Sequence, residues 1–105
     1  MTPEEVAARL RTHDDALRGL GLRSLVLFGS LARGEDGGQS DLDLLYEFDE
    51  GGATLDGLLG LRSLLEEVFH RDVDLVSQKY LSPILQRHIG DDLVPVYGPE
   101  SRPTL

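Results

Sequence analysis

The sequence contains no cysteine, and Lys79 is the only lysine among its 10 basic residues. Without cysteine there can be no disulfide framework and no thiolate metal site. The sequence also lacks any apolar run close to the roughly 20 residues that a membrane-spanning helix needs. Its first residues are acidic, whereas a signal peptide would begin with basic ones. We therefore expect a cytoplasmic protein that does not enter a membrane.

Positive charge is scarce overall, because 19 acidic residues outnumber the 10 basic ones and leave a net charge of −9. This balance argues against direct binding to nucleic acid, whose phosphates are held largely by basic side chains. It favours a partner with a basic surface, although acidity can equally serve only to keep a small protein soluble. The 105 residues, of which 40% are hydrophobic, suffice for one small domain with a real core. We expect that domain to span residues 1–98 and residues 99–105 to form a loose tail.

Helix signals occur at three places in the chain. Thr2, Pro3 and Glu5 form an N-terminal cap for a first helix that should run to the glycines at 19 and 21. Thr54 should begin a second long helix, whose apolar stripe is Leu55, Leu58, Leu61, Leu65 and Val68. A Ser-Pro pair predicts a short helix over residues 82–90.

Short apolar runs bounded by turn residues predict four strands, over residues 25–28, 41–48, 72–76 and 93–97. Residues 30–34 should form one helical turn, and residues 35–39 and 49–53 are loops by composition. Helices and strands alternate along the chain. The sequence therefore predicts an α/β (α+β) fold with a mixed sheet of about four strands flanked by helices.

A glycine turn follows the first predicted strand directly. Gly29 and Ser30 lie between that strand and a helical turn, where unpaired backbone amides favour a phosphate group. Gly29 lets the backbone approach closely, Ser30 adds a hydroxyl donor, and Arg33 lies one turn further on. The spacing from Gly29 to Gly34 is that of a P-loop, but Glu35-Asp36 replace the required Lys-Ser/Thr, so we reject a Walker A site.

Paired carboxylates begin the second predicted strand. Asp41 and Asp43 are two residues apart, so a strand would point both to one face about 7 Å apart. Two such carboxylates could hold Mg²⁺, or one of them could be a turn residue facing water. Asp72 and Asp74 repeat the pattern, and Asp74 lies deeper in its strand. A third acid beside the first pair would complete a two-metal cluster.

The combined pattern is similar to a known family. Residues 28–34 (FGSLARG) and 40–45 (SDLDLL), with Asp74 downstream, resemble the nucleotidyltransferase superfamily of DNA polymerase beta. Within it they resemble the minimal nucleotidyltransferases, or MNT proteins, which are the antitoxin partners of HEPN ribonuclease toxins. The likeness covers roughly residues 3–98.

This resemblance implies a nucleotidyltransferase fold and a role for each motif residue. Asp41, Asp43 and Asp74 would be the catalytic residues and would hold Mg²⁺, as two ions, against the triphosphate of ATP. Gly29, Ser30 and Arg33 would bind the nucleotide. AMP would pass from ATP to a tyrosine hydroxyl of a HEPN-type toxin encoded nearby and silence it.

Two other functions stay open at this point. The chain could be a binding antitoxin that neutralises its toxin by contact, with a vestigial catalytic site. It could instead adenylylate a small molecule such as an aminoglycoside, which would call for a second domain or a dimer to form the acceptor pocket. A core of this size leaves little room for an acceptor pocket, so we expect another chain to supply that surface.

Overall fold

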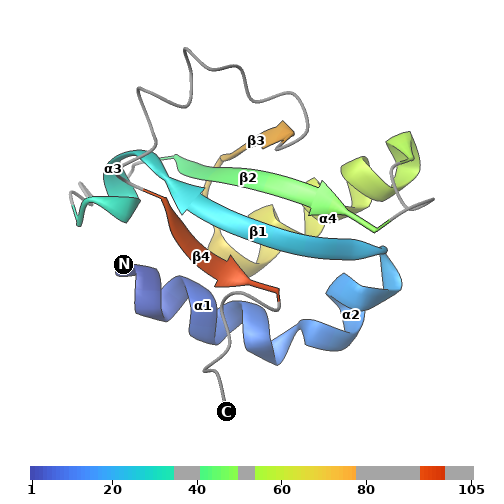
Figure 1. Ribbon diagram of the computed structural model, residues 1–105, viewed down its shortest axis with the longest axis horizontal. Coiled ribbons are helices and arrows are strands. Elements are labelled where there is room, and N and C mark those ends of the chain that lie inside the picture. The colour runs from blue at the N-terminus through green and yellow to red at the C-terminus, as the bar shows by residue number, and fades with distance from the viewer. Residues whose placement is uncertain (35–40, 50–53, 78–92, 99–105) are drawn as a thin grey trace.

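A computed structural model describes residues 1–34, 41–49, 54–77 and 93–98 (Figure 1). Its four-stranded sheet has the order β3-β2-β1-β4, with β2 and β3 parallel and β1 antiparallel to both β2 and β4. The elements are α1 (Pro3–Thr12), α2 (Asp14–Gly19), β1 (Leu22–Phe28), α3 (Gly29–Ala32), β2 (Leu42–Phe48), α4 (Leu55–Phe69), β3 (Val73–Ser77) and β4 (Val94–Tyr97). The predicted mixed sheet flanked by helices is confirmed.

The N-terminal helix begins as the sequence predicts but ends early. Thr2 caps α1, because its hydroxyl accepts a hydrogen bond of 3.2 Å from the amide of Glu5. The single helix expected up to Gly19 is wrong, since the chain leaves helical geometry at His13 and restarts as α2. The Thr12 hydroxyl donates to the carbonyl of Arg9 at 2.7 Å, and His13 Nδ1 lies 3.0 Å from the same oxygen. Such local side-chain bonds compete with the regular helical pattern.

The second long helix, α4, also has its predicted cap. The hydroxyl of Thr54 accepts a hydrogen bond of 3.0 Å from the amide of Gly57. Leu61 and Leu65 are fully buried, as the apolar stripe predicts. Leu55 departs from that prediction, because 71% of its surface is exposed. It lies in the first turn of α4, before the helix reaches the core.

The two faces of the sheet differ in what covers them. Alternate residues of β1 and β2, including Leu25, Leu27 and Leu44, share one core with α1, α2 and α4. The intervening residues point to the opposite face, where Val26 and Leu45 form a second apolar cluster. The helices described thus cover one face, and Asp43, which precedes Leu44 in β2, points to the other.

Strand limits differ from the predicted ones by small amounts. β1 begins three residues earlier than expected, at Leu22, which pairs with Phe48 of β2 beyond a register irregularity between Leu22 and Ser24. Pro95 fits β4 because β4 is at the edge of the described sheet, where a missing amide donor costs no ladder bond. No helix among the described residues is long and apolar enough to cross a membrane. The predicted loop at 35–39, all but the first residue of the predicted loop at 49–53, the helix at 82–90 and the tail at 99–105 lie outside the described residues.

Candidate active site

The predicted carboxylates come from neighbouring strands that start at the same end of the sheet. Asp43 is the second residue of β2, and its register partner in the parallel strand β3 is Asp74. Asp41 lies immediately before β2, two residues from Asp43. Asp43 is half-buried, whereas Asp41 and Asp74 are exposed. Topology therefore brings a residue more than thirty positions away in the chain beside the Asp41/Asp43 pair.

The glycine turn closes the same site from β1. Phe28, the last residue of β1, pairs with Asp43, so Gly29 follows directly beside that carboxylate. Gly29 has a φ of +78°, in the left-handed region that glycine adopts readily. A Cβ atom at Gly29 would lie 3.1 Å from Cγ of Asp43 and would collide with its Oδ2. The backbone of the turn is thus packed against the Asp43 carboxylate.

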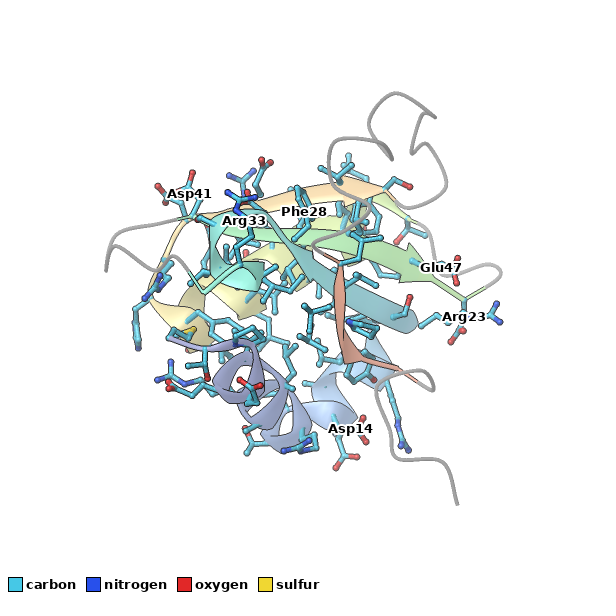
Figure 2. The ribbon with its side chains drawn as sticks, turned by 60° about the vertical axis from the view of Figure 1, so that its left-hand side comes forward. Asp14, Arg23, Phe28, Arg33, Asp41 and Glu47 are labelled. Carbon is cyan, nitrogen blue, oxygen red and sulfur yellow. The ribbon has the colours of Figure 1, made fainter. Side chains whose placement is uncertain are left out.

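The short helix α3 carries the remaining predicted nucleotide-binding residues. Ser30 is its second residue and is half-exposed, and Arg33 follows the helix as its C-cap. The amide of Arg33 donates to the carbonyls of Gly29 and Ser30, at 3.3 and 3.2 Å. The first amides of a helix have no acceptor within it, so those at the start of α3 can face a ligand. Figure 2 shows Arg33 and Asp41 at one end of the sheet, with Arg23 and Glu47 at the other.

The pKa of the Asp43 carboxyl reports how these groups act on one another. Partial burial raises this pKa most, and the negative charges of Asp74 and then Asp41 raise it further. The positive charge of Arg33 acts in the opposite direction and lowers it. The three acids and the arginine are thus close enough to form one electrostatic unit.

The apolar neighbours of Asp43 explain its desolvation, and the sequence alone did not point to them. Phe28 is its cross-strand neighbour, and Leu45 is the next residue of β2 on the same face. Phe28 and Val76 pack against the cluster of Val26 and Leu45. The alternation within β1 and β2 could have indicated this cluster, but only once the register of the two strands is known.

The acids of the site do not form a metal cage by themselves within the described residues. Within the described ranges, no three acidic or histidine side chains are arranged to hold a metal ion by themselves. Mg²⁺ does not require such a cage, because it keeps several waters and is bound by one or two carboxylates together with substrate phosphates. Asp41 and Asp43, beside a turn that can face phosphate, match that donor set. The residues present therefore fit Mg²⁺ bound together with a nucleotide.

Comparison with known proteins agrees with this geometry. Residues 17–101 match the family described as Polymerase beta, Nucleotidyltransferase. The chain is 36% identical over 96 residues to a candidate protein adenylyltransferase of Methanocaldococcus jannaschii, covering 89% of this chain and 96% of the relative. It is 33% identical over 95 residues to the protein adenylyltransferase MntA of Thermococcus cleftensis, covering 90% of this chain and 95% of the relative.

Solved structures share the fold. A candidate minimal nucleotidyltransferase superposes with a TM-score of 0.72 at 36% identity, covering 90% of this chain and 96% of the other. A toxin–antitoxin structure with AMP-PNP matches with a TM-score of 0.64 at 23% identity, covering 88% and 73%. A structure of tri-AMPylated Shewanella oneidensis HEPN toxin in complex with MNT antitoxin matches with a TM-score of 0.55 at 20% identity, covering 90% and 74%. From its sequence match, its fold and its acidic site, the chain belongs to the polymerase beta nucleotidyltransferase family.

Proposed function

We propose that this chain is a Mg²⁺-dependent protein adenylyltransferase that transfers AMP from ATP to a tyrosine hydroxyl of a HEPN ribonuclease toxin and so acts as its antitoxin. The observation that carries the proposal is the register of Asp43 with Asp74, next to Asp41 and the Gly29 turn. Three acids clustered at one end of a sheet repel one another and so do not favour stability. Such a cluster is more typical of a site that binds a charged substrate.

Each site residue has a distinct role in this proposal. Asp41 and Asp43 would hold Mg²⁺ and Asp74 would share a second ion, and the bound metal would neutralise the phosphate charge and align the groups. The turn at Gly29 and Ser30 holds the outer phosphates through backbone amides and the serine hydroxyl. Arg33 donates to the same phosphates and offsets the negative charge of the three acids.

The reaction is an in-line transfer at the α-phosphorus of ATP. The tyrosine oxygen forms a bond to that phosphorus while the bond from phosphorus to the bridging oxygen of pyrophosphate breaks. Asp74 takes the hydroxyl proton, and pyrophosphate leaves with the bonding electron pair. Positioning contributes most of the rate enhancement, because the transferred group needs little covalent help from the protein.

Two features support a protein as the acceptor. Of the two sequence relatives named above, one is a protein adenylyltransferase and the other a candidate one, and one structure of the same fold contains an AMPylated HEPN toxin with its MNT antitoxin. The described elements form the sheet and its core, and the acids lie at an exposed end of that sheet. A macromolecular hydroxyl could reach this end without entering a deep pocket.

The proposal is tested with ATP labelled at the α-phosphate. The chain is incubated with Mg²⁺, the labelled ATP and the HEPN-type protein encoded beside it. We expect label on a tyrosine of the partner, which chelation of Mg²⁺ abolishes. The Asp41→Asn/Asp43→Asn double variant should transfer no label, whereas Glu47→Gln, at the far end of β2, should transfer it normally.

Failure of this test would favour one of the other functions. If the partner gains no label and the double variant still protects cells from the toxin, the chain neutralises its toxin by contact. If the partner gains no label but a small hydroxylated molecule such as an aminoglycoside does, the acceptor is that class of molecule.

A further inference from the structure

Two glycines in the described chain have the same φ but differ in their surroundings. Gly29 and Gly34 both have a φ of +78°, which non-glycine residues rarely adopt, so alanine would strain the backbone at either position. A Cβ atom at Gly34 would meet none of the described residues within 4 Å. A Cβ atom at Gly29 would collide with Oδ2 of Asp43 and lie 3.1 Å from its Cγ. Position 29 therefore requires glycine for two reasons, the positive φ and the lack of space beside the Asp43 side chain.

We propose that Gly29 is a positioning residue for the metal-binding carboxylate of Asp43, in addition to its part in the phosphate turn. The missing side chain leaves the space that the Asp43 carboxylate occupies, and the turn backbone holds that carboxylate from one side. This inference rests on the proposed function for its catalytic consequence, but its structural part does not.

Two movements of the Asp43 carboxylate are unfavourable. Its cross-strand neighbours are Phe28 on β1 and Asp74 on β3. Movement toward Asp74 would increase repulsion between like charges, and movement along the sheet would bring the carboxylate against Leu45 and the apolar cluster. A methyl group at position 29 would therefore displace either the Asp43 carboxylate or the turn.

The structural part is tested by thermal unfolding of a set of variants. Gly29→Ala should lower Tm by several degrees more than Gly34→Ala, because only the first adds a collision to the backbone strain. In an Asp43→Ala background, the additional Tm loss of Gly29→Ala over Gly34→Ala should vanish, since the remaining Cβ of residue 43 would lie at an ordinary contact distance of 3.4 Å. In an Asp43→Asn background this additional loss should persist, because asparagine keeps the colliding atoms while losing the charge.

The catalytic part is tested by the Mg²⁺ dependence of AMP transfer. Gly29→Ala should raise the Mg²⁺ concentration for half-maximal rate by about 10- to 100-fold, as found when groups that orient metal ligands are changed. Gly34→Ala should leave it close to the wild-type value. Mn²⁺ binding in the presence of a non-hydrolysable ATP analogue, followed by electron paramagnetic resonance, should weaken in parallel and needs no turnover.

Distinct results would overturn the inference and the proposed function. Equal Tm losses for Gly29→Ala and Gly34→Ala, or an excess that survives in the Asp43→Ala background, would overturn the positioning role. An unchanged Mg²⁺ requirement in Gly29→Ala would do the same. If the wild-type chain transfers no AMP while the Tm pattern holds, the proposed function fails and the packing of Gly29 against Asp43 stands.

Discussion

Asp43 is a carboxylate in a place that disfavours charge. Partial burial next to Phe28 and repulsion from Asp74 and Asp41 all raise its pKa, and Arg33 compensates only in part. A sequence under selection for stability alone would replace such a residue, because natural proteins tolerate unfavourable charge mainly where function needs it. The arrangement is therefore an electrostatic cost that a bound cation would relieve.

Replacing Asp43 should separate stability from activity. Asp43→Asn keeps the shape of the side chain and removes the repulsion, so the urea midpoint of unfolding should rise. AMP transfer should fall by about 100-fold or more, since a metal ligand is lost. Urea denaturation and labelled transfer on the same preparation measure both effects. A clear fall in the urea midpoint would show that the Asp43 charge stabilises the fold and would contradict this interpretation.

Arg33 should contribute more to ATP binding than to the stability of the fold. It is exposed, and its positive charge acts on the pKa of Asp43. Arg33→Ala should raise KM for ATP about tenfold, the loss expected for one charge-assisted hydrogen bond. Arg33→Lys should restore only part of the affinity, because lysine cannot bind a phosphate through two parallel hydrogen bonds. Steady-state kinetics at saturating Mg²⁺ test this, and an unchanged KM in Arg33→Ala would contradict it.

At the level of helices and strands, the caps are the best-determined local features. The hydroxyl of Thr54 satisfies a free amide at the start of α4, which supplies Leu61 and Leu65 to the core. Thr54→Ala should reduce the free energy of unfolding by about 1 kcal/mol. Thr54→Ser keeps the acceptor oxygen and should stay close to wild type. Chemical denaturation measures the free energy of unfolding of both variants. Equal losses of this free energy in Thr54→Ala and Thr54→Ser would mean that the hydroxyl does not cap the helix.

Most elements could be predicted from the sequence because their signals are local. Caps at Thr2 and Thr54, apolar runs and glycine turns mark the starts and ends of helices and strands without reference to the rest of the chain. The break at His13 could not be predicted, since the apolar spacing continues through it and only the side-chain bonds to the Arg9 carbonyl interrupt the helix. The exposure of Leu55 depends on where α4 meets the core, which periodicity does not specify.

The site was predicted from motif spacing, but its internal contacts depend on the fold. Asp41 and Asp43 could be paired from the period of a strand. The place of Asp74 beside them follows from the parallel register of β2 and β3, which is a long-range property. The contact of Gly29 with Asp43 and the apolar neighbours of Asp43 become visible only once β1 is aligned with β2.

Across the whole molecule, the last described strand is tied to the N-terminal helices. Tyr97, at the end of β4, is buried, and its hydroxyl hydrogen-bonds the carboxylate of Asp14 on α2. Arg18 pairs with the same carboxylate at 3.0 Å. Burial raises the pKa of Tyr97 above its usual 10.0, and the charge of Asp14 and the hydrogen bond to it raise it further, against a lowering by Arg18. The protonated hydroxyl thus links the last described strand, β4, to α2.

This tie should weaken in alkaline solution. Because the folded-state pKa is raised, the stabilisation is complete below pH 10 and is lost as pH rises through the higher folded pKa. Tyr97→Phe should lose about 1 kcal/mol of stability at neutral pH through the missing hydrogen bond. The difference between wild type and variant should shrink above pH 10. Urea denaturation across that range tests this, and a constant difference would contradict it.

The core and the candidate site lie on opposite faces of the sheet. The core with α1, α2 and α4 lies on one face, and the acidic site lies at one end of the other, with α3 and Arg33 beside it (Figures 1 and 2). Binding at the site need not disturb the main core. Substitutions at the acids should therefore leave the protein folded, which makes a direct observation of the occupied site feasible.

A crystal of the chain with Mn²⁺ and a non-hydrolysable ATP analogue would test the central claim most directly, through the anomalous scattering of manganese. We expect a manganese peak bound by the carboxylates of Asp41 and Asp43, with Asp74 facing the same ions and the outer phosphates against the turn at Gly29 and Ser30. Nucleotide density without manganese between those carboxylates, or Asp74 turned away from the α-phosphate, would contradict the account.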